Sequence, residues 1–326
     1  MAQHAGPGEP SFVLDVRPRV EDALLAAVHA DDPFLTEVAS HLIVAGGKRV
    51  RPLFAAAAGA CATRGAPVRD EVVLGGVAVE LVHLGSLYHD DVIDEAPTRR
   101  TVESVNARWG NLTAILAGDF LLAKASEIAA SLGTEVAALL AATIGRLCEG
   151  EVGELRSAYD ISRSEGAYLT SIRGKTASLF ATACRIGAIV GGLPREHVES
   201  LTTFGDGYGM AFQIVDDVLD LTATAAQLGK PAGHDLVEGV YTLPVLRALA
   251  APGSEGLAKM LGTPLDDEQL AAALSLVRSD GAVPAALAAA TAYVDAAVAS
   301  LSSLGDDPAV EWLSASARNL VVDLVS

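Results

Sequence analysis

Hydrophobic residues recur at three- and four-residue spacing through most of the chain, with alanine, leucine, glutamate and arginine between them. This period is typical of amphipathic helices, and the intervening residues are strong helix formers. Sustained alternation with a period of two, which would predict strands, is scarce. The pattern predicts an all-α protein with helices at residues 18–30, 34–44, 48–64, 69–96, 112–132, 134–158, 165–192, 196–222, 239–251, 267–280, 283–304 and 307–325.

The breaks between these helices are short and carry glycine or proline, and no Pro/Gly/Ser-rich linker divides the chain. We therefore expect a flexible tail over residues 1–12 and a single domain over residues 13–326. The helices predicted at 165–192 and 283–304 are apolar nearly all round, which indicates positions in the centre of a helical bundle.

The formal net charge is −18, and no stripe rich in lysine and arginine is present. An acidic surface repels phosphate backbones, which argues against a nucleic-acid partner. Charges such as Arg185 and Asp295 interrupt the apolar windows, so no transmembrane segment is predicted. The opening MAQHAGPGEPSF lacks the basic and apolar regions of a signal peptide, which favours a cytoplasmic location.

Two stretches, HDDVID and VDDVLD, each place three aspartates at positions i, i+1 and i+4 inside an apolar helix; these are Asp90, Asp91 and Asp94, and Asp216, Asp217 and Asp220. Grouped carboxylates repel one another and are costly to bury, so they need cations. A few oxygen ligands, completed by water and phosphate, are typical of Mg²⁺ sites. A single such motif also occurs at helix ends or in surface acidic patches. A glycosidase would instead use two single acids in different environments.

Positive charge is concentrated in GGKRVRP and TRR, which indicates a small anionic ligand in an otherwise acidic chain. Lys48 and Arg51 lie at the start of a predicted helix, where side-chain charge and free N–H groups bind diphosphate. Arg99 and Arg100 follow the first aspartate motif. Taken alone, Arg99 and Arg100 also fit counter-charges at a helix end, and Lys48 and Arg51 also fit surface residues in the first turn of a helix.

Five further polar residues accompany the motifs. His83 lies two turns before Asp90, although a histidine there also fits a satisfied core residue. The stretch IRGKTASLF supplies Lys175 and Thr176 inside an apolar helix, where a buried lysine needs an anion. Gln213 precedes the second motif on the same face, and a lysine on the loop beyond it, Lys230, is placed to close over the site.

Taken together, the chain from about residue 40 onward resembles the trans-isoprenyl diphosphate synthases of the polyprenyl synthetase family, through GGKRVRP, VELVHLGSLYHDDVIDEAPTRR, NARWGNLTAILAGDFLLA, IRGKTASLF, FQIVDDVLD, LGKPAGHDL and YTLPVL. The resemblance implies an isoprenoid synthase-type helical bundle with a central substrate cavity, usually a homodimer. It also implies head-to-tail condensation of isopentenyl diphosphate with an allylic diphosphate, with three Mg²⁺ ions in each active site.

The resemblance assigns roles to the residues named above. Asp90 and Asp94, supported by Asp91, would ligate Mg²⁺ on the allylic diphosphate, and the second motif would hold a further ion from the opposite wall with Asp216, Asp217 and Asp220. Isopentenyl diphosphate would be bound by Lys48, Arg51, His83 and Arg100. The allylic diphosphate would be faced by Arg99, Lys175, Thr176, Gln213 and Lys230. Two positions depart from the family pattern, Thr101 in place of glycine and His234 in place of asparagine or threonine.

Product length depends on what lies beside the growing tail. Gly85 and Ser86, about one turn before Asp90, are small, which favours a product of C30 or longer over farnesyl or geranylgeranyl diphosphate. Alternative residues for a floor are Leu81, Val82 and Tyr88. A class I terpene cyclase usually has a different second metal motif, and a non-catalytic partner subunit would be expected to lose motif charges, none of which is missing.

Overall fold

The computed structural model describes residues 10–63, 67–222, 232–279 and 281–325. Within these ranges helices are joined by loops and the only strands form one short hairpin, so the expected all-α class is confirmed. The helices are α1 (Ser11–Ala27), α2 (Pro33–Val44), α3 (Val50–Ala60), α4 (Asp70–Ile93), α5 (Val105–Trp109), α6 (Asn111–Ser131), α7 (Thr134–Leu155), α8 (Glu165–Ile172), α9 (Ser178–Gly191), α10 (Arg195–Thr222), α12 (His234–Val237), α13 (Leu243–Ala250), α14 (Glu255–Met260), α15 (Asp267–Ser279), α16 (Ala282–Ser300) and α17 (Pro308–Val325).

Three shorter features complete the fold. A π-helical turn, η1 (Arg173–Ala177), joins α8 to α9, and a 3₁₀ turn, η2 (Leu301–Leu304), follows α16. Strands β1 (Thr98–Arg99) and β2 (Val102–Glu103) form an antiparallel pair after α4. The hairpin and the helices α5, α12 and α14 were not predicted, because elements of two to six residues are too short to show a period.

The first helix begins earlier than predicted. Helix α1 starts at Ser11 rather than at residue 18, so the end of the predicted tail is helical. The buried positions Val13, Val16, Val20 and Leu24 form one apolar stripe across Pro18. Burial of this stripe therefore outweighs the helix-breaking tendency of an exposed proline.

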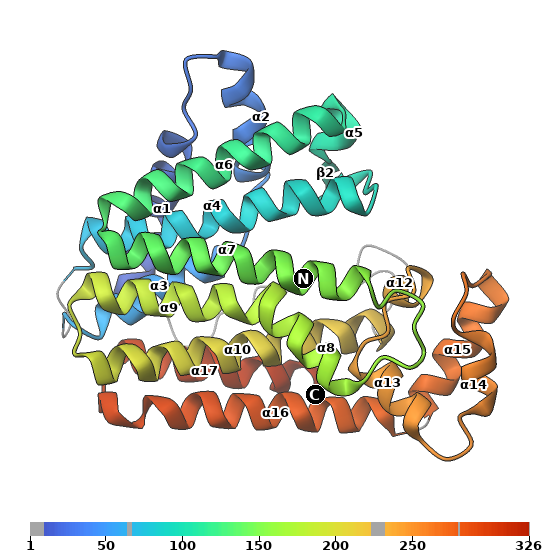
Figure 1. The fold of residues 1–326 in the computed structure, drawn as a ribbon. Coiled ribbons are helices and arrows are strands. Elements are labelled where there is room, and N and C mark those ends of the chain that lie inside the picture. The colour runs from blue at the N-terminus through green and yellow to red at the C-terminus, as the bar shows by residue number, and fades with distance from the viewer. Residues whose placement is uncertain (1–9, 64–66, 223–231, 280, 326) are drawn as a thin grey trace.

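The centre of the bundle is formed by helices α3, α4, α9 and α10, several of which run side by side in Figure 1. Close helix contacts depend on glycine. At Gly187 in α9, an added Cβ would overlap the carbonyl oxygen of Ala55 in α3, so only glycine permits this approach of the two backbones. The predicted central position of residues 165–192 holds for α9, whose side chains are largely buried.

Helix α16 corrects the prediction for residues 283–304. It packs on α10 and lies along the lower edge of the bundle in Figure 1. Only one stripe of α16 is buried, at Ala282, Ala286, Ala290, Val294 and Ala297. Most of the remaining alanines are exposed, since alanine is apolar but small enough to be exposed at little cost.

Two helical segments, Asp70–Ile93 and Ala282–Leu304, are long and apolar enough to cross a membrane by length and composition alone. This corrects the expectation that no such window exists. In α4, 72% of the window is buried inside the protein, so core packing explains its apolar character. In the second segment 33% is buried, consistent with its place at the edge of the bundle.

Candidate active site

Both aspartate motifs lie at the same end of the bundle. Figure 1 shows the C-terminal ends of α4, α7 and α10 on one side, beside the hairpin and α12. The first motif occupies the last turn of α4 and the second the last turns of α10. The fold therefore brings together two motifs that are more than 120 residues apart in the sequence.

Lys175 lies on η1, which packs against α7 and α10, and it is within electrostatic range of Asp90 in α4. Its ammonium group forms salt bridges with Glu151 Oε2 and Glu154 Oε1 of α7, each at 2.7 Å. Burial alone would lower the pKa of Lys175, but the two glutamates raise it above its usual value. Sequence reasoning missed both glutamates. Their signal was an E-x-x-E spacing, which places two acids on one face of a helix.

Two glycines allow α7 and η1 to approach closely enough for these salt bridges. An added Cβ at Gly150 would lie 2.5 Å from the backbone nitrogen of Lys175. An added Cβ at Gly174 would lie 2.7 Å from the carbonyl oxygen of Arg146. The π-helical turn at Lys175 is a feature that occurs frequently at functional sites.

The first and third aspartates of the first motif face this cluster or solvent. Burial raises the pKa of Asp90 to about 7, Lys175 opposes the shift, and Glu151 and Asp94 add to it. Asp90 is therefore within electrostatic range of α7 and η1. Asp94 is exposed at the end of α4.

The second aspartate of this motif is in a different environment. Asp91 is 0% exposed, and its Oδ1 atom accepts a hydrogen bond from Arg99 Nε at 2.6 Å. Its Oδ2 atom is buried and has no hydrogen-bond partner among the described residues. Arg99, expected at the allylic diphosphate, thus contacts Asp91 in this structure.

Asp217 is the corresponding residue of the second motif, and it is 4% exposed. Its Oδ2 atom accepts a hydrogen bond from the Tyr168 hydroxyl, and its Oδ1 atom accepts one from Gln213 Nε2 at 2.9 Å. Gln213 is held in turn by the Thr176 hydroxyl at 2.7 Å. Burial raises the pKa of Asp217 to about 7, while the bonds from Tyr168 and Gln213 lower it. Sequence reasoning missed Tyr168.

The other residues of the second motif lie at the end of α10. Asp216 is exposed, and Asp220 Oδ2 accepts a hydrogen bond from the backbone nitrogen of Asp235 at 3.2 Å. This bond docks the short helix α12 onto the motif. His234, the second departure from the family pattern, is exposed and lies 3.0 Å from Glu238. The predicted ligand Lys230 lies outside the described residues.

Arginines gather around His83, two turns before Asp90. Burial lowers the pKa of His83 well below its usual value, and Arg51 and Arg100 lower it further, followed by Arg99 and Arg49. The histidine is therefore neutral at neutral pH and can act as a hydrogen-bond partner rather than a cation. Burial also lowers the pKa of Arg51 to about 10, and its guanidinium lies 4.5 Å over the Phe180 ring.

A buried carboxylate, Glu80, offsets part of this positive charge. Its Oε1 atom lies 3.1 Å from Arg49 and 4.0 Å from Arg100. Arg100 also donates to the carbonyl oxygen of Leu42 at 3.0 Å. Lys48 is exposed at the edge of this cluster. Sequence reasoning missed Glu80 and Arg49, because a buried pair of this kind depends on tertiary contacts.

Thr101, the first departure from the family pattern, lies in the turn of the β1–β2 hairpin. Arg100 and Thr101 are the two turn residues, and both have positive φ values, 51° and 66°. A two-residue hairpin turn with positive φ at both positions is of type I′, which favours asparagine and glycine. Thr101 therefore adopts a conformation that glycine would adopt without strain.

The residues expected to control product length lie on two sides of α4. An added Cβ at Gly85 would lie 3.1 Å from the carbonyl oxygen of Gly118 in α6, so Gly85 serves as a contact between helices. Ser86 is half-buried, and its hydroxyl donates to the carbonyl oxygen of His83. The Tyr88 hydroxyl donates to the carbonyl oxygen of Val38 in α2 at 2.8 Å, which removes Tyr88 from the alternatives for a floor.

The carboxylates fit a divalent cation that other ligands help to hold. Among the described residues, no group of three or more histidine, cysteine or acidic side chains is close enough to hold an ion by itself. Buried acids with raised pKa values and the orphaned Oδ2 atom of Asp91 nevertheless call for positive charge. Mg²⁺ suits such a set, because it retains water and takes ligands from substrate phosphates.

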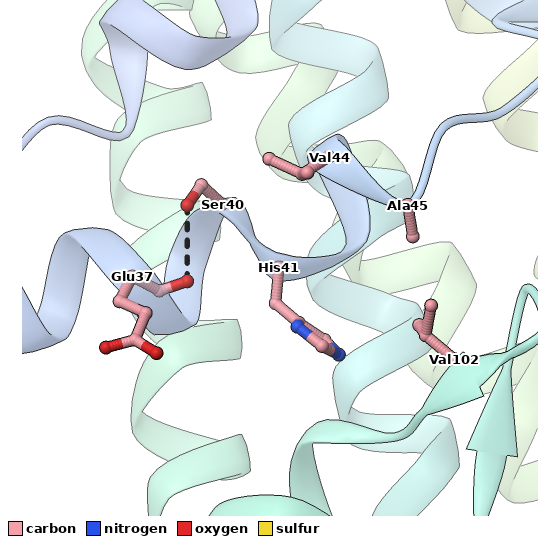
Figure 2. Close-up of a pocket in the computed structure, with 6 residues that line it drawn as sticks. All are labelled: Glu37, Ser40, His41, Val44, Ala45 and Val102. Carbon is pink, nitrogen blue, oxygen red and sulfur yellow. Dashed lines mark hydrogen bonds between the residues drawn. The ribbon is translucent and has the colours of Figure 1, made fainter.

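A separate surface pocket of about 330 Å³ lies beside α2 (Figure 2). It is lined by Glu37, Ser40, His41, Val44, Ala45 and Val102. His41 Nε2 lies 2.7 Å from the carbonyl oxygen of Glu103, which ties α2 to the hairpin. No residue of the aspartate motifs lines this pocket, so it is distinct from the site described above.

Comparison with known proteins identifies the family of the chain. The model of the polyprenyl synthetase family matches residues 32–277. The chain is 40% identical to heptaprenyl diphosphate synthase component 2 of Geobacillus stearothermophilus over 90% of this chain and 91% of that protein. The structure of a decaprenyl diphosphate synthase from Rhodobacter capsulatus superimposes with a TM-score of 0.88 at 35% identity, covering 95% of this chain and 97% of that one.

A geranylgeranyl pyrophosphate synthase from Corynebacterium glutamicum, solved with calcium and isoprenyl diphosphate, is 40% identical with a TM-score of 0.83, covering 97% of this chain and 98% of that one. The matches thus extend over nearly the whole chain and include the predicted motifs. The chain belongs to the polyprenyl synthetase family and is a trans-prenyltransferase of the all-α isoprenoid synthase fold.

Proposed function

We propose that this enzyme condenses isopentenyl diphosphate head-to-tail with an allylic diphosphate to make an all-trans polyprenyl diphosphate of C30 or longer. A single catalytic domain that begins with α1 carries the reaction, in the cytoplasm. The observation that supports this best is the convergence of Asp90 and Asp217 on the cluster of Lys175, Glu151 and Glu154, beside the arginines around His83. In this proposal the arginines around His83 bind one diphosphate, Lys175 binds the other, and the aspartates beside them hold the metal ions.

In this proposal Asp90, Asp94 and Asp216 hold the ions most directly. Asp91, Asp217 and Asp220 already accept hydrogen bonds from the protein and keep the two walls in place. Bound Mg²⁺, proposed as three ions, would neutralise the allylic diphosphate and ease its departure. Lys175 and Thr176 face the same diphosphate with Gln213 and Arg99, and Lys230 completes the set.

The second substrate, isopentenyl diphosphate, is proposed to bind Lys48, Arg51, His83 and Arg100. The reaction breaks the C–O bond at C1 of the allylic substrate, and the electron pair leaves with the diphosphate. The double bond of isopentenyl diphosphate forms a new bond to that carbon, and a proton is lost to the departing diphosphate. Lys175 stabilises the charge that develops on the leaving oxygen, and preorganised electrostatic stabilisation of this kind is usually the largest single contribution to catalysis.

The proposal of a C30 or longer product is supported by the small residues Gly85 and Ser86 and by relatives named as heptaprenyl and decaprenyl diphosphate synthases. The geranylgeranyl synthase among the similar structures supports the alternative of a C20 product. The test is chromatography of the products formed from geranyl diphosphate and, in a separate assay, from farnesyl diphosphate, each with isopentenyl diphosphate and Mg²⁺. Products of C30 or longer are expected. Products of C15 or C20 alone would indicate the shorter-chain activity. A cyclic hydrocarbon would indicate a terpene cyclase, and the absence of any product would indicate a non-catalytic subunit.

We also propose that the enzyme is a homodimer. Helix α6 exposes Leu112, Ile115 and Leu116 to the extent of 73%, 41% and 57%, at spacing i, i+3 and i+4. A row of large apolar side chains on one helix face is typical of a protein interface. The relative named component 2 supports the alternative of a second, different chain. Sedimentation of the purified protein distinguishes a dimer from a monomer that needs a partner.

A further inference from the structure

The single positive charge of Lys175 is paired with two carboxylates, one more than is required to neutralise it. Glu151 and Glu154 both lie 2.7 Å from its nitrogen, and their side chains are each only 18% exposed. Glu151 also acts on Asp90, and Glu154 acts on Asp217. The pair therefore adds negative charge at the place where an anionic substrate is proposed to bind. Such an arrangement opposes substrate binding, so it needs a reason other than affinity.

We propose that Glu151 and Glu154 are positioning residues, which fix the Lys175 ammonium at one point between the two aspartate motifs so that it meets the leaving oxygen of the allylic diphosphate. The inference rests on the proposed function, in which Lys175 faces that diphosphate. A free lysine samples many rotamers along its four-carbon chain. Two carboxylates on successive turns of α7 restrict those rotamers before substrate arrives.

A fixed cation is expected to raise the rate of C–O bond breaking rather than the affinity for the substrate. Negative charge on the leaving oxygen grows as the C–O bond breaks, and a preorganised cation stabilises that charge without first having to reorient. Neutralising one glutamate loosens Lys175 and at the same time reduces repulsion of the diphosphate. The two effects act in opposite directions on kcat and on binding, which separates this role from a lost substrate contact.

The test compares Glu151→Gln, Glu154→Gln and the control Glu149→Gln, an exposed acid on the same helix. In single turnovers of the first condensation we expect Glu154→Gln and Glu151→Gln each to lower the rate about tenfold, less than the loss of a whole donor. The KM for isopentenyl diphosphate stays unchanged, the KM for the allylic substrate does not rise, and Glu149→Gln matches the parent. An unchanged rate, or a rise in both KM values together with a lower Tm, overturns the proposal.

A second arm asks whether the glutamates act through Lys175. In a Lys175→Met background, neither substitution is expected to lower the rate further, because residues that act as one unit are not additive. Multiplying effects would overturn the proposal. So would recovery of the Glu151→Gln rate at high Mg²⁺, since that result assigns a metal ligand. A Lys175→Met enzyme that keeps the parent rate refutes the site assignment itself, and a parent without condensation refutes the proposed function.

Discussion

Replacing Asp90 by asparagine should stabilise the metal-free protein while removing its activity. Asp90 lies in a largely buried position near Glu151 and Asp94, and burial raises its pKa from 3.8 to about 7. The native state therefore disfavours the charged form of Asp90, the form in which we propose that it holds an ion. Asparagine has nearly the same shape without the charge, so the variant avoids that cost.

The size of the effect follows from the pKa. A shift from 3.8 to about 7 is about 3 units, and at 1.36 kcal/mol per unit this corresponds to an upper limit of about 4 kcal/mol. The folded state binds this proton more tightly than the unfolded state, so stability falls as the pH rises from about 4 to about 7. The difference in the free energy of unfolding between the variant and the parent is thus small near pH 4 and reaches its full size by pH 8.

Urea unfolding in EDTA at several pH values and one protein concentration measures this gap. We expect Asp90→Asn to be more stable than the parent at pH 8, by up to about 4 kcal/mol, and to approach the parent at low pH. Prenyl transfer in Mg²⁺ should fall by three orders of magnitude or more. The matched control, Asp94→Asn, removes an exposed acid of the same motif and should lose activity with a smaller gain in stability at pH 8 than Asp90→Asn, because it removes only the repulsion between Asp94 and Asp90. A gap that is absent at pH 8, or that does not change with pH, would refute the reasoning.

Four further outcomes are expected. Thr101→Gly should raise stability by about 1 kcal/mol in thermal unfolding, because the type I′ turn then contains no strained β-branched residue; a loss of stability would contradict the turn assignment. Tyr168→Phe removes one donor to Asp217 and should lower kcat about tenfold with little change in fold, as circular dichroism can verify; an unchanged kcat would leave Tyr168 without a role. Leu116→Glu should shift sedimentation from dimer to monomer, and a persistent dimer would move the interface elsewhere. Ser86→Phe should shorten the products seen by chromatography, with less disturbance than a phenylalanine at Gly85, which contacts α6; unchanged lengths would remove Ser86 from the tail path.

The sequence predicted the fold class and most long helices because both depend on local periodicity. Helix α10, expected at 196–222, is found at Arg195–Thr222, and α7, expected to start at 134, starts at Thr134. The aspartate motifs were equally visible, since spacing i, i+1 and i+4 has a fixed meaning on a helix. Such features need no knowledge of which helix packs on which.

The parts that could not be predicted depend on packing between distant segments. Glu151 and Glu154 become part of the site only because glycines bring α7 against η1. The type I′ turn at Thr101 is stabilised by its surroundings against the preference of threonine. The edge position of α16 was missed because an alanine-rich helix has nearly the same pattern in a core and on a surface.

The two aspartate motifs look alike in sequence, but within each motif the adjacent aspartates lie in different environments. Residues i and i+1 of a helix are about 100° apart around its axis, so the second aspartate of each motif points away from the first. Asp91 and Asp217 accordingly turn into the protein, where Arg99 holds one and Tyr168 and Gln213 hold the other. Donors of the protein already hold Oδ1 of Asp91 and both oxygens of Asp217, so we propose that the outer aspartates take the ion. In the proposed function, the adjacent aspartates would serve as one anchor and one metal ligand in each wall, which gives a reason for a doublet where a single acid would supply the same charge to the metal.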